Sequence, residues 1–440
     1  MLHAAAACGV LLDLAGIFIQ TAGGHHAGGV VLRMIALLLL CGYTYARRSL
    51  TAWTLLAMLA GAELGADAPR AAVHMHFLGE IFLRLIRVIA APLILGTLTT
   101  GIASHGHLRK LGRVALKTFL YFEAVTTLGL IFGAVAINIS RAGVGIALPA
   151  SVAENLPTAS RGWEQILLNA FPENLALAVA QNQILQIAIF SLLFGVALAL
   201  LSEEKRAPLL SVLQSLTETM FQITRIVMYF APIAAGAAIA YTVGSMGLAT
   251  LVPLAKLVAT YYVALIVFAL LVLLPVMLGA RIPLRRFLAA AGEPAAIGFA
   301  TSASEAALPL ALENMEKFGV PRWIVSFVIP AGYTFNMDGA SIYLSIGAIF
   351  ATQAAGIHLS LEQQVMMLLT LMLTSKGIAG VPRATLVLLL ATASSLHVPI
   401  APIFLILGVD ALMDMGRTAM NVFGNCLASA VIARWEGAST

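Results

Sequence analysis

Five polar residues near the carboxyl end of the chain follow one another at helical spacing. Asp410, Asp414, Arg417, Asn421 and Asn425 are separated by four, three, four and four positions, which places them on one face of an α-helix. A charged side chain in the middle of a bilayer costs at least about 2.5–3.5 kcal/mol on insertion scales. If this helix lies in a membrane, its polar face must therefore meet partners inside the protein.

Two interpretations of Asp414 and Arg417 are open. They lie three positions apart and would neutralise each other as a structural ion pair. Alternatively, Arg417 offers a bidentate fork to a substrate carboxylate while Asp414 accepts a substrate ammonium group. We favour binding, because a structural pair leaves Asn421 and Asn425 unexplained. An amino acid with an acidic side chain fits both groups.

A second polar cluster lies at Asn336 and Asp338, inside an apolar span that reads Gly-Tyr-Thr-Phe-Asn-Met-Asp-Gly from Gly332 to Gly339. The simplest interpretation is a kinked helix with hydrogen-bonded polar groups. A hard cation such as sodium needs several oxygen ligands, and an unwound stretch offers backbone carbonyls beside side-chain oxygens. The cluster therefore favours a cation site.

Three further groups have two interpretations each. Ser302, Ser304 and Glu305 have the spacing of a helix cap, and the same helix start could present its amides to an anion. Glu123 interrupts an apolar span, so it either pairs with a neighbouring helix or carries a proton. Lys376 and Arg383 bracket a small-residue segment, where they mark a water-exposed gate edge or steer substrate.

The region from 283 to 434 repeats one plan. Thr301-Ser302 precedes Pro309 by the interval at which Thr374-Ser375 precedes Pro382, and each segment is followed by a Met-Asp cluster at 337–338 or 413–414. Short apolar segments interrupted by Ser, Gly and Pro at corresponding positions of two repeats indicate a transporter binding site.

The elements around these residues belong to a membrane protein. Of 440 residues, 60% are hydrophobic and 10% are charged, whereas soluble domains carry about a quarter charged residues. The net charge of +5 comes from basic residues scattered in short connectors, which indicates topology and excludes a nucleic-acid partner. The three cysteines have neither paired nor metal-ligand spacing.

Hydropathy predicts the membrane segments in order. They lie near 49–66, 76–103, 111–138, 176–201, 207–242 and 249–280, followed by broken segments. The basic connectors fall after every second span, so that side should be cytoplasmic. Residues 4–22 and 29–45 are apolar but interrupted by Asp13 and Arg33, and we expect residues 1–48 to be an N-terminal extension with one or two extra membrane segments.

Four motifs in order resemble the dicarboxylate/amino acid:cation symporters, the glutamate transporter family. They are Thr301 to Pro309, Gly332 to Gly339, Lys376 to Pro382 and Asp414 to Asn425. The resemblance runs from about Ser49 through Glu436. It implies an all-α membrane fold of eight transmembrane helices and two re-entrant hairpins (about 283–312 and 361–396), built on an inverted repeat.

The resemblance also implies how the protein is organised and where it works. A scaffold (mainly 49–103 and 173–242) would hold a transport region (mainly 111–138 and 249–434) that moves as an elevator, in a homotrimer of the cell inner membrane. No cofactor is implied beyond coupling sodium ions or protons. Substrate would contact Ser304, Val381, Asp414, Arg417, Thr418 and Asn421. Cation ligands would be Thr126, Gly332, Thr334, Asn336, Asp338, Ser375, Ile378, Asn421 and Asn425, with Glu123 a candidate for proton coupling.

Three positions depart from the common pattern of this family. Asn425 stands where sodium-driven members often have Asp, Ala340 where Thr or Ser is common, and Arg383 where Gly is common. We expect a symporter of glutamate, aspartate or C4-dicarboxylates; a neutral amino acid carrier and an ion channel are the alternatives. Polarity concentrated in two repeated segments disfavours a continuous pore, and the absence of a Gly-x-Ser-x-Gly nucleophile motif disfavours a hydrolase.

Overall fold

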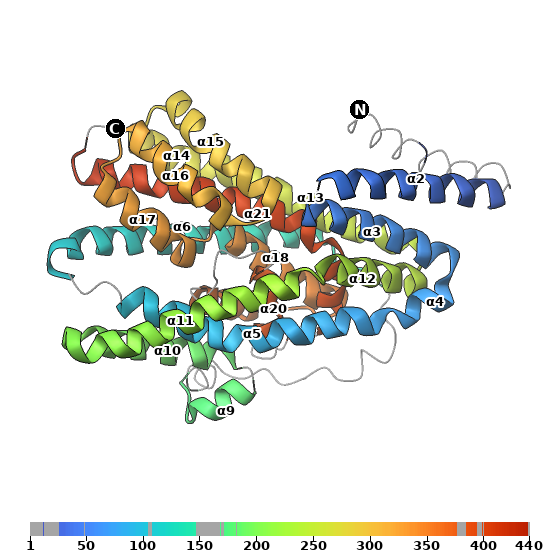
Figure 1. The fold of residues 1–440 in the computed structure, drawn as a ribbon, viewed down its shortest axis with the longest axis horizontal. Helices are drawn as coiled ribbons and strands as arrows, with labels where there is room; N and C mark the ends of the chain where they lie inside the picture. The colour runs from blue at the N-terminus through green and yellow to red at the C-terminus, as the bar shows by residue number, and fades with distance from the viewer. Residues whose placement is uncertain are drawn as a thin grey trace. The chain divides into compact units, whose positions relative to one another are not determined.

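The computed structural model describes residues 12, 26–47, 49–103, 108–146, 168, 171–181, 183–375, 384–393, 398 and 400–438. These residues form helices joined by short connections, with no strand among them (Figure 1). The described part of the chain is thus all-α, as the sequence predicts. Its contacts divide it into two units, residues 1–80 with 229–249 and residues 81–228 with 250–440.

The first unit is built around α3 (Leu50–Asp67), which contacts α2 (His26–Arg47) and α12 (Ala231–Met246); α12 also contacts α4 (Pro69–His74). Gly61 of α3 and Gly236 of α12 let the two backbones touch, because a Cβ on Gly236 would lie 2.7 Å from the carbonyl oxygen of Ala57. Small residues at such a crossing are typical of helices that associate in a membrane.

In the described part of the chain, the second unit begins with four longer helices and the short helix α9. They are α5 (His76–Ala103, from residue 81), α6 (Leu108–Ser140), α9 (Leu175–Ala180), α10 (Ile184–Ala199) and α11 (Glu203–Met228). After η1 (Leu248–Thr250) the next span runs through α13 (Leu251–Phe268), the π-helical turn η2 (Ala269–Leu273) and α14 (Leu274–Gly279). Pro275 lacks the N–H that a regular α-helix would need there, which accounts for the π turn.

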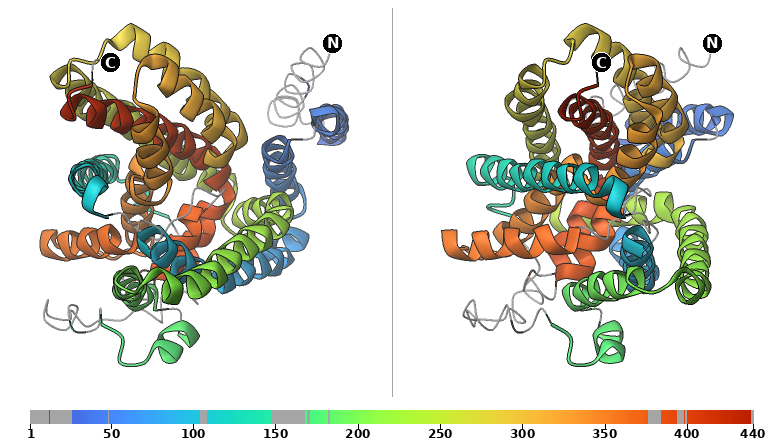
Figure 2. Two further views of the ribbon diagram at one scale, coloured as in Figure 1. Left: turned by 60° about the vertical axis from the view of Figure 1, so that its left-hand side comes forward. Right: turned by 90° about the vertical axis from the view of Figure 1, so that its left-hand side faces the viewer.

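The rest of the second unit consists of broken helices around one continuous helix. α15 (Leu284–Thr301) and α16 (Ser304–Phe318) form a tight hairpin, α17 (Arg322–Phe335) and α18 (Asp338–Ala354) form a broken span, and α19 (Leu361–Thr374) and α20 (Ala384–Ala393) flank residues outside the description. α21 (Ile400–Trp435) contacts α15, α16, α17, α18 and α20. Figure 2 shows the yellow hairpin beside the dark red α21.

The helix pair α15–α16 begins at Leu284 and ends at Phe318, whereas the sequence predicts a re-entrant hairpin over about 283–312. α16 continues to Phe318 and stops at Gly319, whose φ of 117° is a left-handed conformation that glycine adopts readily. The predicted span 207–242 is interrupted at Tyr229 and Phe230, ahead of Pro232. A proline at the start of α12 fits there because its missing N–H would have no helical partner.

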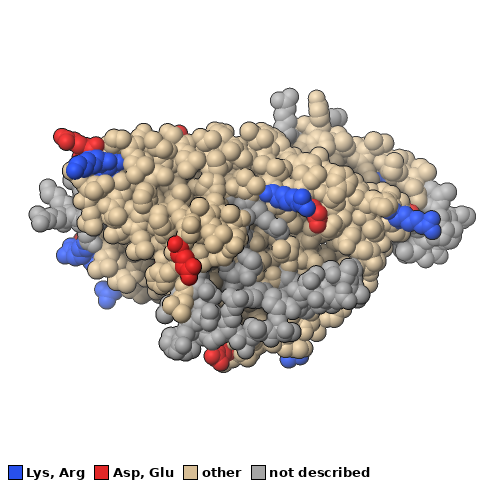
Figure 3. Space-filling view, turned by 90° about the horizontal axis from the view of Figure 1, so that it is seen from below, with Lys and Arg blue, Asp and Glu red and all other residues tan. Residues whose placement is uncertain are grey.

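Among the residues that the structure describes, three helical segments are long and apolar enough to cross a membrane: Gly29–Ala46, Arg113–Ser140 and Leu248–Gly279. A fourth results if α11 and α12 are taken as one span. α21 is not one of them, although its 36 residues extend about 54 Å. Its sequence includes Asp410, Asp414, Arg417, Asn421 and Asn425. On the face drawn in Figure 3, described side chains that are neither acidic nor basic cover most of the surface.

Charged residues join the ends of two helices in the second unit. Glu436, just after α21, accepts hydrogen bonds from Arg113 (2.7 Å) and Lys117 (2.5 Å) of α6. The hydrogen bonds from Arg113 and Lys117 hold the pKa of the Glu436 carboxyl below its usual range. This contact joins the carboxyl end of α21, the helix with the polar face from Asp410 to Asn425, to the start of α6.

Candidate functional site

The break between α17 and α18 faces α21. Asn336 and Met337 leave the helical conformation (φ −117°, ψ 84° and φ −115°, ψ 70°). The side chains of Asn336 and Asp338 are completely buried. Pro330, six residues before the break, weakens the helical hydrogen bonding of α17. The break therefore brings polar backbone and side-chain groups into the interior of the second unit.

Two glycines make room for these polar side chains. A Cβ on Gly424 of α21 would collide with the Asp338 carboxylate, and a Cβ on Gly332 of α17 would collide with the Asn425 amide oxygen. Asn336 donates a hydrogen bond through Nδ2 to that same Asn425 oxygen (3.0 Å). The polar side chains of this cluster are thus packed against one another and against glycines of α17 and α21. They belong to Asn336, Asp338 and Asn425.

One amide oxygen of this cluster remains for another partner. Because Asn336 donates to Asn425, its own Oδ1 is an acceptor, and this buried atom has no hydrogen-bond partner among the described residues. The Asp338 carboxylate lies two residues along the chain. Oxygen atoms of this kind are the ligands that hard cations prefer. Among the described residues, no group of three His, Cys, Asp or Glu side chains could hold a metal ion.

Asn421 has a role that sequence reasoning missed. Its Oδ1 accepts hydrogen bonds from the backbone N–H groups of Gly339 (2.8 Å) and Ala340 (3.3 Å). The side chain therefore caps the first turn of α18 from the neighbouring helix, where orphan N–H groups need acceptors. Its buried amide nitrogen has no hydrogen-bond partner among the described residues, so the remaining donor suits an anionic group better than a cation.

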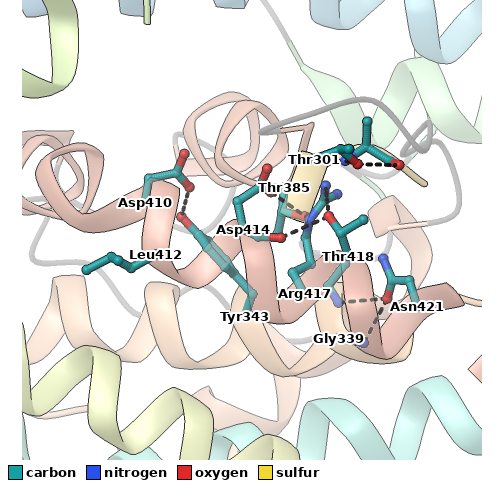
Figure 4. A network of polar contacts seen from close by, with 12 residues as sticks. Thr301, Gly339, Tyr343, Thr385, Asp410, Leu412, Asp414, Arg417, Thr418 and Asn421 are labelled. Atoms are coloured by element: carbon teal, nitrogen blue, oxygen red, sulfur yellow. Dashed lines mark hydrogen bonds and ion pairs between the residues drawn. The ribbon is translucent and has the colours of Figure 1, made fainter. Parts of the chain in front are cut away.

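The centre of the polar face is an ion pair without solvent exposure. Arg417 Nε lies 2.7 Å from Asp414 Oδ1, and the side chains are 0% and 2% exposed. Figure 4 shows the pair with Thr418, whose hydroxyl accepts a hydrogen bond from Arg417 Nη2 (3.0 Å). Leaving one member of a buried ion pair unpartnered costs about 3–5 kcal/mol. A ligand that separates Arg417 from Asp414 must therefore offer a new charged partner to each of the two side chains.

Both broken hairpin segments approach this ion pair. Arg417 Nη1 is 3.5 Å from the hydroxyl of Thr385, in the first turn of α20. A Cβ on Gly298, near the tip of the α15–α16 hairpin, would contact the Thr418 methyl at 3.3 Å. Ser304 begins α16 with a buried hydroxyl that has no hydrogen-bond partner among the described residues. α20 thus reaches Arg417 through Thr385, and the α15–α16 hairpin reaches the adjacent Thr418.

Asp410 lies further along the same face and has a different partner. Tyr343 of α18 donates a hydrogen bond to Asp410 Oδ1 (2.6 Å), and both side chains are completely buried. Tyr261 of α13 donates to the carbonyl oxygen of Gly339 (3.0 Å). Neither tyrosine was a predicted site residue, because an aromatic residue in an apolar helix looks like ordinary core. They could have been identified only from the tertiary structure, which places a carboxylate next to Tyr343 and a broken helix next to Tyr261.

The remaining predicted residues are placed as follows. Thr126 of α6 is buried, and its hydroxyl donates a hydrogen bond to the carbonyl of Phe122 (2.7 Å). Ser375 follows α19, and its hydroxyl donates to the carbonyl of Met372 (3.0 Å). Thr334 and Glu123 are half-buried. α6 approaches the break, because a Cβ on Gly129 would lie 3.2 Å from the carbonyl oxygen of Asp338. Ile378, Val381, Lys376 and Arg383 lie outside the described residues.

The sequence profile of the sodium:dicarboxylate symporter family matches residues 50–435. The chain belongs to the sodium:dicarboxylate symporter family. This confirms the family that the four motifs predicted and places the buried ion pair in a family of transporters. The matched range begins at the first residue of α3 and ends at the last residue of α21, so α2 precedes it.

Several transport proteins are similar to this family member over most of their length. The proton/glutamate-aspartate symporter of Escherichia coli (strain K12) is 41% identical over 81% of this chain and 84% of the relative. A C4-dicarboxylate transport protein of Anaeromyxobacter sp. (strain K) is 40% identical over 89% and 90%. The proton/sodium-glutamate symport protein of Bacillus caldotenax is 38% identical over 84% and 89%.

Proposed function

We propose that the protein is a secondary active symporter of acidic amino acids, with C4-dicarboxylates as the alternative substrate, coupled to protons, sodium ions or both. The observation that carries this proposal is the buried pair of Arg417 and Asp414, which α20 approaches through Thr385. Relatives named for glutamate and aspartate and for C4-dicarboxylates are about equally similar to the chain. The chemistry of the pair must therefore decide between the substrates.

The pair suits an acidic amino acid better than a dicarboxylate. Arg417 presents a planar fork to a side-chain carboxylate, and Asp414 accepts a hydrogen bond from an ammonium group. The Asn421 amide nitrogen and the amides at the start of α16 provide donors for the α-carboxylate. A C4-dicarboxylate has no group for Asp414 and would place like charges together. Substrate contacts at Ser304, Thr418 and Val381 complete this proposal.

Replacing Asp414 by asparagine is expected to separate amino acids from dicarboxylates. The variant keeps the shape of the side chain but loses the negative charge that binds an ammonium group, so aspartate uptake should fall by about 10- to 100-fold, on the scale of 1.5–3 kcal/mol for a charged hydrogen bond. Succinate uptake should fall less or rise. Competition of each compound against labelled substrate measures the two affinities; equal losses for aspartate and succinate would contradict the amine assignment.

We place cation binding at the break between α17 and α18. Asn336 Oδ1 and the Asp338 carboxylate would be the main oxygen ligands, supported by Thr126, Gly332, Thr334, Ser375, Ile378 and Asn425. Asn425 supplies an amide where a carboxylate would offset the cost of removing water from sodium. A sodium site between Asn425 and Asn421 is therefore weak, which leaves part of the coupling to protons.

Glu123 is our candidate for the proton carrier, and Glu123→Gln is expected to remove the response to a proton gradient. The half-buried side chain lies on α6, the helix that approaches Asp338 at Gly129. Glutamine keeps the size of the side chain but cannot release a proton. Uptake driven by an inward proton gradient without sodium should fall by about tenfold or more, whereas substrate exchange should continue. Proton-driven uptake that survives unchanged would assign the proton to another group.

We further propose the arrangement that the family resemblance implies. Eight spanning helices and two re-entrant hairpins would form a scaffold (mainly 49–103 and 173–242) and a moving transport region (mainly 111–138 and 249–434) in a homotrimer of the cell inner membrane. The tight connection at Ser302 and Ala303 supports a hairpin that turns back inside the membrane. α21, with its buried charges, supports a polar transport region shielded from lipid.

One reconstitution experiment tests the function as a whole. Purified protein in liposomes is supplied with labelled glutamate, aspartate, succinate or serine while sodium and proton gradients are imposed separately. Saturable uptake of aspartate or glutamate that accelerates with substrate on the opposite side supports the symporter. Preference for serine would identify a neutral amino acid carrier, and flux that neither saturates nor accelerates would identify a channel.

A further inference from the structure

α2 lies before the residues that match the family, and its two faces differ in an unusual way. The face with buried side chains carries small or polar residues: Gly29, Arg33, Ala36 and Thr44. These positions follow steps of four, three and eight, so they form one helical stripe. Because α2 contacts α3, this stripe is the docked face of α2.

Large apolar side chains occupy the opposite face of α2. They include Leu38 (70% exposed), Val31 (57%) and Met34 (56%). A helix at a protein–water boundary has the reverse pattern, with its apolar stripe turned inward. Small residues inside and large apolar residues outside are typical of a membrane helix, where lipid tails accept the apolar face and small residues let helices approach.

Arg33 explains how this helix is held. Its guanidinium Nη2 donates to both carboxylate oxygens of Asp67, at 2.9 and 2.7 Å. The Arg33 side chain is 4% exposed, although it belongs to an apolar segment long enough to cross a membrane, Gly29–Ala46. An arginine in such a segment must pair or reach water, and the structure shows it paired.

The ion pair also matches the geometry of two antiparallel helices. α2 ends at Arg47 and α3 begins at Leu50, and a connection this short joins antiparallel neighbours. Arg33 lies 14 residues before the end of α2 (47 − 33) and Asp67 lies 17 residues after the start of α3 (67 − 50). Both charges therefore lie far from the turn, and their ion pair joins the amino-terminal part of α2 to the carboxyl end of α3.

We propose that α2 is a membrane-spanning helix additional to the symporter core, docked on α3 by the Arg33–Asp67 ion pair and covered on its outer face by lipid acyl chains. Its 18-residue apolar segment extends about 27 Å, close to the roughly 30 Å of a bilayer's hydrocarbon core. The sequence Arg47-Arg48 at the carboxyl end of this segment predicts that this end is cytoplasmic. His26, at the other end, then lies on the opposite side.

Spin labelling of full-length protein in liposomes tests the lipid-facing surface. Single cysteines replace Leu38 on the outer face or Ala36 on the docked face (0% exposed), in a background with Cys8→Ser, Cys41→Ser and Cys426→Ser. The Leu38→Cys label should be accessible to oxygen but not to a water-soluble nickel complex, and the matched Ala36→Cys label to neither. Access of nickel to position 38 would mean water. Exclusion of both reagents from it would mean a protein cover, such as residues 1–25, and either result overturns the proposal.

Two further measurements test the span and the ion pair. An impermeant maleimide should label His26→Cys and Ser49→Cys from opposite sides of sealed vesicles; labelling from the same side would place α2 on the membrane surface and overturn the span. Arg33→Leu and Asp67→Leu should each mobilise the spin label at position 36, and the exchanged pair Arg33→Asp with Asp67→Arg should restore its immobility. A label that stays immobile in the single variants, or mobile in the exchanged pair, overturns docking by the ion pair.

Discussion

Replacing Arg417 by cysteine is expected to abolish uptake of acidic substrates. The arginine is completely buried, so a substrate carboxylate that reaches this position without it loses its only adjacent cation among the described residues of the polar face. An unpaired buried charge costs about 3–5 kcal/mol, which corresponds to a loss of roughly 100-fold or more in affinity. Initial rates of labelled aspartate and glutamate uptake into proteoliposomes measure the effect.

The same variant should gain binding of neutral amino acids. Cysteine leaves room where the guanidinium lay, and Asp414 remains to accept the ammonium group that all amino acids share. Serine should then compete for uptake in Arg417→Cys more strongly than aspartate. Arg434→Cys is the matched control, because Arg434 belongs to the same helix but donates to the carbonyl of Arg281. Normal glutamate uptake by Arg417→Cys, or a folded variant that never binds serine, would show that Arg417 does not read the substrate side chain.

The positions along α21 were predictable because helical spacing decides which residues share a face. Asp414, Arg417 and Asn421 are all buried on that continuous helix, as their spacing predicts. The break at Asn336 was also predictable, since polar residues within an apolar span cannot face lipid. Local sequence therefore identified the two polar elements of the candidate site before any tertiary contact was known.

The contacts between these elements were not predictable in the same way. Spacing along one helix does not reveal which residue of another helix lies opposite, so the hydrogen bond of Tyr343 to Asp410 and the approach of Thr385 to Arg417 required the tertiary structure. The same reason applies to Gly424, which allows the Asp338 carboxylate to lie against α21. Glycine is common in membrane helices, and nothing in its neighbourhood along the chain identifies a partner 86 positions away (424 − 338).

The tertiary contacts also refine how the asparagines of the site divide their work. Sequence reasoning assigned Asn421 to both substrate and cation, yet its oxygen already caps α18. Asn336, by contrast, donates to Asn425 and keeps its own oxygen as an acceptor. We therefore assign the cation mainly to the Asn336 and Asp338 end of the cluster and the substrate to the Asn421 and Arg417 end. This division is a proposal that substitutions at the two ends can test separately.

Replacing Asp338 by asparagine is expected to remove stabilisation of the protein by sodium. The carboxylate is completely buried at the break, and it is the charged oxygen group that would offset the cost of dehydrating a cation there. A ligand at 100 times its dissociation constant stabilises the folded state by about 2.7 kcal/mol. Purified protein should therefore show a thermal midpoint that rises with sodium chloride but not with choline chloride, and Asp338→Asn should show no rise.

A neighbouring substitution and a reverse substitution sharpen this test. Ser341→Ala removes a buried hydroxyl that donates to the carbonyl of Met337 (2.9 Å), in the same turn of α18 but without changing charge, so its response to sodium should persist. Asn425→Asp adds a carboxylate beside Asn336 and keeps an acceptor for the Nδ2 of Asn336. This variant should shift the sodium response to lower concentrations by about tenfold.

If Asp338→Asn responds to sodium like the unaltered protein, the cation lies elsewhere. If the unaltered protein shows no sodium response and is driven by protons alone, the break does not bind sodium and coupling belongs to a protonated group such as Glu123.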